Sequence, residues 1–318
     1  MSAPVTITPL TGIPEVREGD DLADVVQLGL DHAGVRLADG DVVVISSKVA
    51  SKALGLVTHD PDKDRVVRGE TEYVVAERAV GDRVTRIVRA KAGPIMAAAG
   101  VDGSNTGDRG GWLLLPHDPD GVCERVHEAL TARHGVRIGV VLSDTAGRAW
   151  RVGQVDFALG AHGLRVLDDL RGGIDADGKP LEVTARAVAD EIAAAADLVK
   201  GKVAAVPVAV LRGIPGLLVD EPLESHPRGR DLVRTGPGDW FGYGRVEAVR
   251  AALHGVESGT ADVGRLSVTL GADSPYELGR LVARLTTALW CEWLVGEAGP
   301  PSADGLSAVV QIAGAHSA

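Results

Sequence analysis

Cysteine and aromatic residues are both scarce in this chain of 318 residues. The two cysteines, Cys123 and Cys291, lie far apart and form no CxxC pattern, which excludes a disulfide framework and a cysteine-rich zinc site. Aromatic residues make up only 3% of the chain, whereas 45% of it is hydrophobic. The core must therefore be built from Ala, Val, Leu and Ile.

The chain also lacks an excess of basic charge and a long apolar run. Its formal net charge is −11, which disfavours binding to nucleic acid or to an anionic membrane surface. No apolar stretch reaches the roughly 18 residues of a spanning helix, and MSAPVTITPL is no secretory signal. The nine histidines form no HExxH motif, and no GxSxG motif occurs. These features indicate a cytoplasmic protein that is neither a zinc hydrolase nor a serine hydrolase of that type.

Short β-branched runs alternate with helical patterns along the first two thirds of the chain. This alternation has no strict βαβ rhythm and predicts a mixed α/β or α+β fold. The expected strands cover VTIT near the start and residues 41–47, 83–90, 137–144 and 203–211, and the expected helices cover residues 20–34, 119–135 and 182–202.

The texture changes after Arg212 to a stretch rich in Gly, Pro and charge. We therefore predict a large unit over residues 1–222, a linker or lid over 223–240 and a small C-terminal α/β unit over 241–318. Within the small unit we expect a helix over 245–254, a strand over 265–271, a helix over 275–295 and a strand over 307–312. The apolar face of the long helix comprises Leu278, Leu281, Val282, Leu285, Leu289 and Trp293. This face favours the core of a small subdomain over a dimer contact.

One glycine-rich stretch has the spacing of a phosphate-binding P-loop but is not expected to be one. In GIDADGK, from Gly173 to Lys179, the next residue is Pro180, so the hydroxyl that would bind Mg²⁺ is missing. No apolar strand precedes the first glycine either. We interpret the stretch as a polar loop whose aspartates favour a turn.

Polar residues at the ends of apolar strands are stronger candidates for a site. Ser46, Ser47 and Lys48 end the run DVVVISSK, and Lys52 follows, so that hydroxyls and lysines could hold a phosphate. Taken alone, this pattern fits a solvated turn better. The loop AAAGVDGSNTGDRGGW contains Asp102, Ser104, Asn105 and Asp108 among glycines, which suits either a close approach to a ligand or an exposed Asx-turn loop.

Asp144 and Thr145 follow the apolar strand IGVVLS, at the edge of a sheet where open α/β folds bind ligands. A carboxylate and a hydroxyl suit a hard cation such as Mg²⁺ or Mn²⁺, and Asp102 could add a second carboxylate. The alternative is that Asp144 caps the following turn. Arg148 and Arg151 could pair with phosphates or face solvent.

Six separated blocks, in order, resemble the coenzyme F420:L-glutamate ligases. They are GIPEVREGDDL, DGDVVVISSKVASKA, AAAGVDGSN, LLLPHDPDG, GVVLSDTAGRAWRVGQ and EVTARAVADEIAAAADLVKGK with the following VPVAVLRG. The resemblance covers about two thirds of the chain, from Ile7 to Arg212. It implies a γ-glutamyl ligase fold in the large unit.

The resemblance also implies roles for individual residues. Residues matching the GTP site are Ile13, Pro14, Glu15, Val16, Ser47, Lys52 and Asn105. Asp102 and Asp144 match ligands of one divalent metal, and Thr145 matches a ligand of a second. No residue is assigned a catalytic role. A basic pocket of Lys48, Lys52, Lys91, Arg148 and Arg151 would balance the anionic substrates.

The implied activity is GTP-dependent addition of L-glutamate to the coenzyme F420 precursor through an acyl phosphate. The implied cations are Mg²⁺ or Mn²⁺, with K⁺ as a further candidate, and the implied assembly is a homodimer. In this chain Lys200, Gly201 and Lys202 stand where some members carry a glycine-rich acidic segment. The C-terminal unit is short for the flavin-binding domain of fused relatives. The alternatives are a metal-dependent GTP phosphohydrolase or phosphotransferase and a catalytically silent nucleotide-binding protein.

Overall fold

The structure, a computed structural model, describes residues 4–80, 83–107, 110–202, 204–219, 226–235, 239, 241–242, 244, 247, 260–263, 267–291 and 294–314. The chain divides into two compact units. The first comprises Met1–Val74 and Thr85–Gly238, and the second comprises Val75–Val84 and Asp239–Ala318.

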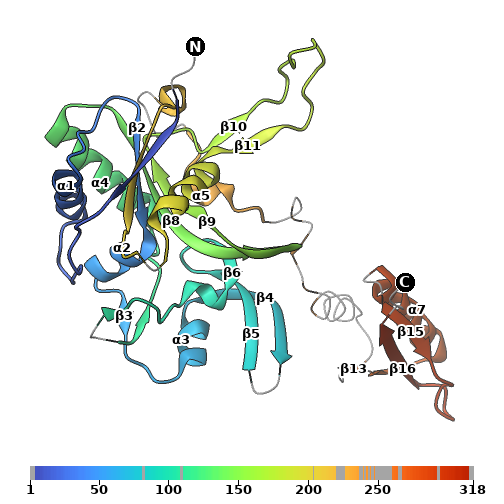
Figure 1. The fold of residues 1–318 in the computed structure, drawn as a ribbon. Helices are drawn as coiled ribbons and strands as arrows, with labels where there is room; N and C mark the ends of the chain where they lie inside the picture. Colours follow the sequence, from blue (N-terminus) through green and yellow to red (C-terminus); the bar gives the residue numbers. More distant parts are fainter. Residues whose placement is uncertain are drawn as a thin grey trace. The chain divides into compact units, whose positions relative to one another are not determined.

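A five-stranded sheet forms the centre of the first unit (Figure 1). Its order is β1 (Thr6–Leu10), β12 (Val208–Arg212), β2 (Asp41–Ser46), β8 (Ile138–Arg148) and β9 (Arg151–His162). β2 and β8 are parallel, whereas the other neighbours are antiparallel. The polar residues that follow β2 therefore lie next to the polar residues at the same height in β8.

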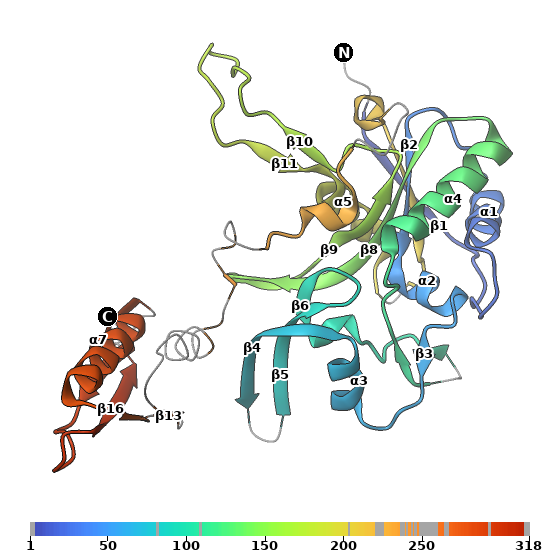
Figure 2. The same ribbon diagram turned by 180° about the vertical axis from the view of Figure 1, so that it is seen from behind.

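Helices cover both faces of this sheet. They are needed on both because alternate side chains of β2 are apolar and point to opposite faces. Val43 and Ile45 pack in the cluster that contains α1 (Leu22–Ala33), α2 (Ser47–Ala53) and α4 (Pro119–His134), whereas Val42 and Val44 pack in the cluster that contains α5 (Val188–Lys200). The reverse view shows α1 and α4 together on one face (Figure 2). Successive side chains of a strand point to opposite faces, so a continuous Val run suits a strand covered on both.

Shorter elements surround the sheet. β3 (Val57–Thr58) pairs with β7 (Trp112–Leu113), and β4 (Thr71–Val80), β5 (Arg83–Ala90) and β6 (Ile95–Ala97) form a three-stranded sheet. Near them lie α3 (Lys63–Gly69) and the 3-10 helix η1 (Ala98–Gly100), and β10 (Leu167–Asp169) pairs with β11 (Ala185–Ala187). The predicted mixed α/β class is confirmed.

Two expected elements were too long. The helix expected over 182–202 begins only at Val188, because Ala185–Ala187 form β11 and pair with β10. The strand expected over 203–211 begins at Val208, and Ala205 has a left-handed φ of 51°. Between β10 and β11, the Asp175 carboxylate accepts the N–H groups of Asp177 and Lys179, so the P-loop-like stretch is the polar turn that we predicted.

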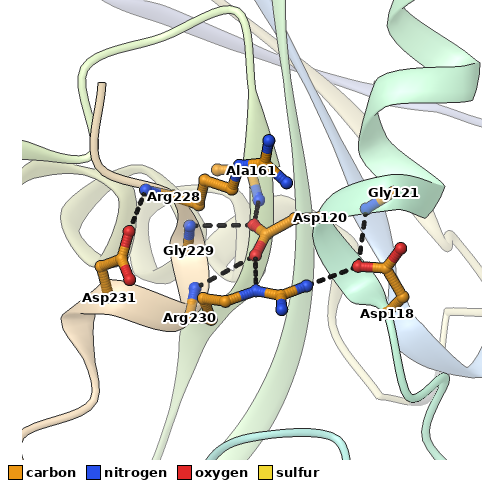
Figure 3. A network of polar contacts seen from close by, with 8 residues as sticks. All are labelled: Asp118, Asp120, Gly121, Ala161, Arg228, Gly229, Arg230 and Asp231. Carbon is orange, nitrogen blue, oxygen red and sulfur yellow. Dashed lines mark hydrogen bonds and ion pairs between the residues drawn. The ribbon is translucent and has the colours of Figure 1, made fainter. Parts of the chain in front are cut away.

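Within the first unit, a buried carboxylate joins residues 228–230 to α4 and β9 (Figure 3). Asp120 in α4 accepts the N–H groups of Ala161 and Gly229, each at 2.9 Å, and forms an ion pair with Arg230 at 2.9 Å. The 3-10 helices η3 (Pro215–Leu217) and η5 (Gly229–Leu232) contribute Leu217 and Leu232 to the cluster around α5. The predicted boundaries at residues 222 and 240 lie outside the described residues and stay a prediction.

The second unit contains an antiparallel sheet in the order β13 (Thr260–Val263), β14 (Ser267–Gly271), β16 (Ser307–Gly314) and β15 (Leu294–Ala298), with α7 (Pro275–Cys291). α7 presents Leu278, Leu281, Leu285 and Leu289 to this unit's core, with Val282 partly buried beside them, as the subdomain interpretation predicts.

The long C-terminal helix ends earlier than expected. Leu294 and Val295 pair with Gly314 and Ala313 instead of continuing α7, because β15 completes the sheet. Trp293 and the helix expected over 245–254, apart from Glu247, lie outside the described residues. In the described part of the chain, no helix is both long and apolar enough to span a bilayer.

Candidate functional site

A cavity of about 410 Å³ opens in the first unit, at the end of β2 and beside Ser143–Thr145 in the middle of β8. Its lining includes every predicted site residue except Ser47 and Asp102: Ile13, Pro14, Glu15, Val16, Lys52, Asn105, Asp144 and Thr145. Polar residues not predicted for the site also line it: Ser143, Asp156, Asp197, Lys200 and Lys202. Segments that are far apart in the sequence therefore meet at one cavity.

The parallel pairing of β2 and β8 explains why the second and fifth sequence blocks meet. Ser46 lies opposite Ser143 in the register, so Ser47 and Asp144 follow side by side. The Ser47 hydroxyl, only 1% exposed, donates a hydrogen bond of 2.8 Å to Asp144 Oδ1. Ser47 thus lies behind the cavity wall and orients Asp144 towards the cavity.

Lys48 connects α2 to the glycine-rich loop. Its Nζ lies 2.6 Å from Asp102 Oδ2 and also contacts the Ser104 hydroxyl. Asp102 accepts the Ser104 N–H as well, which is the hydrogen bond of an Asx turn, and the same loop contributes Asn105 to the cavity lining. Burial raises the pKa of Asp102, but the bonds from Lys48 and Ser104 outweigh it and hold the pKa below its usual range. Asp108 lies outside the described residues.

An ion pair also links α2 to the segment after β1. Lys52 Nζ lies 2.5 Å from Glu15 Oε1, so the side chain predicted to contact GTP holds the segment Ile13–Val16 beside the cavity. Asn105 enters the lining from the opposite loop with a left-handed φ of 56°. Non-glycine residues rarely adopt this conformation, and asparagine tolerates it best.

Asp144 is a titratable group of the cavity lining with a raised pKa. Burial raises the pKa of Asp144 to about 6, and the charge of Asp156 adds to this effect, whereas the bond from Ser47 and the charge of Lys48 oppose it. The negative charge of such a carboxylate is only partly balanced by neighbouring positive charges. It is therefore suited to bind a cation.

Sequence reasoning did not identify the network beneath Asp144. Asp156 in β9 lies opposite Thr145 and accepts its hydroxyl at 2.7 Å, while its other oxygen accepts the Ser143 hydroxyl and forms an ion pair with Lys200, both at 2.9 Å. Burial raises the pKa of Asp156, but the charge of Lys200 and these bonds lower it overall. A lone Asp inside the apolar run VDFALG was the signal that could have revealed it.

The predicted basic pocket was partly wrong. Lys48 and Lys52 line the cavity, but Lys91, Arg148 and Arg151 do not, and all three are exposed. The arginines lie at the far end of the β8–β9 hairpin, beyond Thr145. Two other lysines line the cavity: Lys200, the last residue of α5, which is paired with Asp156, and Lys202, which lies just after that helix.

The residues around Asp144 fit one hard cation. Asp144 offers a poorly neutralised carboxylate, whereas the Asp102 carboxylate of the neighbouring loop is paired with Lys48 and would have to exchange that partner for the cation. Among the described residues, no group of three or more His, Cys, Asp or Glu side chains could enclose a metal. The chain would therefore provide few ligands, and nucleotide phosphates or water would complete the coordination, as is usual for Mg²⁺.

The pKa of Asp144 predicts how stability depends on pH. Because the folded-state pKa of about 6 lies above the 3.8 of an unperturbed aspartate, the folded protein binds the proton more tightly than the unfolded chain does. The ionised carboxylate thus destabilises the fold, and this effect develops as pH rises from about 4 to about 6. Asp144→Asn keeps the acceptor for Ser47, so without metal it should raise the free energy of unfolding at pH 8 by about 1–2 kcal/mol.

Denaturant unfolding of both proteins between pH 4 and pH 8 measures this difference. The difference in stability should shrink towards pH 4, where Asp144 is protonated in the folded protein and the unfolded chain begins to take up the same proton. A variant that is less stable than the parent at pH 8 would contradict the expectation.

Comparison with known proteins identifies the family. Residues 12–59 and 56–213 match the family described as F420-0:Gamma-glutamyl ligase. The chain is similar to the coenzyme F420:L-glutamate ligase of Archaeoglobus fulgidus, with 37% identity over 225 residues, which cover 66% of this chain and 88% of the relative. The protein of that name from Methanothermobacter thermautotrophicus is 35% identical over 231 residues, covering 66% and 90%. The cavity lies within the matched region, and the chain therefore belongs to the F420-0:gamma-glutamyl ligase family.

Proposed function

We propose that this protein joins L-glutamate to the coenzyme F420 precursor through an amide bond, with GTP as the source of energy. The names of the relatives support the two substrates. The observation that carries the proposal is the single cavity in which Ile13–Val16, Asn105, Lys52 and Asp144 converge from separate blocks of the family match.

The chemistry requires activation of a carboxylate. Transfer of the γ-phosphoryl group of GTP to the precursor's carboxylate would give an acyl phosphate and GDP, and attack by the glutamate amine would then release phosphate. All the reactants are anionic, so Lys48 and Lys52 would reduce their repulsion at the cavity. A divalent cation, Mg²⁺ or Mn²⁺, held by Asp144 and Asp102 would neutralise charge on the phosphate oxygens.

The segment Ile13–Val16 is the proposed contact for the guanine base. Pro14 fixes its own backbone φ, so the segment loses little conformational freedom when a base binds. Its attachment through Glu15 and Lys52 limits that freedom further. We therefore expect GTP to be used in preference to ATP.

The other implied properties remain proposals: a homodimer, K⁺ as an additional cation and a cytoplasmic location.

Mass spectrometry of the deazaflavin product tests the proposal. After incubation with GTP, Mn²⁺ or Mg²⁺, glutamate and the precursor, the product should be heavier by one glutamyl residue, with one GDP formed per amide. GDP formed equally fast without glutamate and precursor would favour the phosphohydrolase alternative. Binding of GTP without any product would favour the silent nucleotide-binding protein. Equal use of ATP in competition would contradict the assignment of the base contact.

A further inference from the structure

Lys200 occupies an unusual position for a lysine. It is the last residue of α5, yet it is only 3% exposed, whereas lysines are almost never fully buried unless they are paired. Ile192, Ala196 and Lys200 recur every four residues on the buried face of the helix. The helical period therefore directs Lys200 inwards, to the floor of the cavity.

The ammonium group of Lys200 is held by two oxygens. Nζ donates to Ser143 Oγ at 2.6 Å and to Asp156 Oδ2 at 2.9 Å. The other carboxylate oxygen of Asp156 accepts the Thr145 hydroxyl at 2.7 Å. Ser143 is fully buried and Asp156 is 5% exposed, so solvent contributes little to either group.

This network uses the oxygens that a second cation beside Thr145 would need. The hydroxyls of Ser143 and Thr145 both direct their protons to Asp156, and an ammonium already neutralises that carboxylate. A divalent ion there would lie close to a buried positive charge, in surroundings where such repulsion is strong. Asp144, by contrast, has no ion pair among its described contacts, and only the more distant charge of Lys48 favours its ionised form.

We propose that the ammonium group of Lys200 takes the place of a second divalent cation, so that each chain binds one such ion together with its nucleotide. The inference rests on the proposed GTP-dependent function. Lys200 is a positioning residue here: it supplies a fixed positive charge and orients Asp156, which in turn orients Thr145. The resemblance assigned Thr145 to a second metal, and the donor set around Thr145 does not fit one.

Counting bound Mn²⁺ tests the inference without any turnover. The folded protein is saturated with a GTP analogue whose β–γ bridge is an imido group, and Mn²⁺ is measured by equilibrium dialysis and electron paramagnetic resonance. We expect one Mn²⁺ per chain and no spin coupling between two ions. Two ions per chain, with coupling, would overturn the inference while leaving the proposed function intact. No bound Mn²⁺ at all would contradict both.

Substitution of Lys200 provides the converse test. Lys200→Met removes the ammonium but keeps a long side chain, so the freed oxygens of Asp156, Ser143 and Thr145 should bind a second Mn²⁺. A folded Lys200→Met protein that still binds one ion would show that the ammonium does not exclude the second, and would overturn the inference.

A double variant guards against misfolding, because Lys200→Met leaves a buried carboxylate unpaired. Lys200→Met combined with Asp156→Asn removes both charges and should bind one Mn²⁺, as the parent does. A second ion in this double variant would place the additional site elsewhere and overturn the inference. Thermal unfolding of each variant identifies the proteins that have folded.

Discussion

Asp144→Asn should lower glutamate ligation by about 100-fold to 1,000-fold, the range expected when one preorganised electrostatic contribution to the transition state is lost. The substitution keeps the size of the side chain and an acceptor for the Ser47 hydroxyl, but it removes the anionic charge facing the cavity. Binding of Mn²⁺ with the GTP analogue should weaken in parallel. Initial rates of amide formation at saturating Mn²⁺ and GTP, together with the Mn²⁺ titration, measure both effects.

The matched control is Asp169→Asn. Asp169 is an exposed carboxylate in β10, paired with Arg171 and absent from the cavity lining. The same chemical change there should leave ligation within about twofold of the parent, since exposed ion pairs contribute little. Full activity of Asp144→Asn would remove Asp144 from the proposed site, and equal losses in both variants would point to a general effect of charge.

Gly160→Ala should lower the free energy of unfolding by about 3 kcal/mol or more, at the upper end of the cost of overpacking. A Cβ at Gly160 would lie 2.4 Å from the carbonyl carbon of Pro119 and 2.7 Å from the N atom of Asp120. These are backbone atoms at the start of α4, so no side chain can rotate away. The clash would displace Asp120 from Ala161 and Gly229, which it joins (Figure 3).

Gly147→Ala is the control for that substitution. Gly147 lies in β8, the strand paired with β9, and a Cβ there would meet no atom within 4 Å. Its effect should stay within about 0.5 kcal/mol, because it mainly reduces the freedom of the unfolded chain. Denaturant unfolding measures both variants. If Gly160→Ala were as stable as Gly147→Ala, the close approach of β9 to α4 would not exist in solution.

The elements that the sequence predicted best are those whose local pattern and tertiary surroundings agree. The Val run over Asp41–Ser46 is buried on both faces, and the helix over Pro119–His134 begins after the cap Asp118 and ends before Gly135 in the left-handed region. Where the local pattern and the tertiary surroundings disagreed, strand pairing determined the secondary structure. Ala185–Ala187 have good helix propensity but pair with β10, and Leu294 continues an apolar pattern but pairs with β16.

The candidate site was predicted in outline because its polar residues stand out where apolar runs end. Asp144 follows the buried part of β8, Lys52 lies in α2 directly after β2, and both line the cavity. Lys200 could not be found in this way. A lysine in the last turn of a helix usually lies on the surface, where its charge interacts favourably with the helix dipole. Only the packing of α5 on the sheet shows that Lys200 is buried.

The strand order of the central sheet has a consequence for synthesis of the chain. β12 lies between β1 and β2, so Thr6–Leu10 have no strand partner until Val208–Arg212, about 200 residues later, have left the ribosome. Such distant pairings form slowly and favour exposed intermediates. A nascent chain stalled before residue 208 would therefore carry an unpaired edge on β2, the edge that Val208–Leu211 later cover.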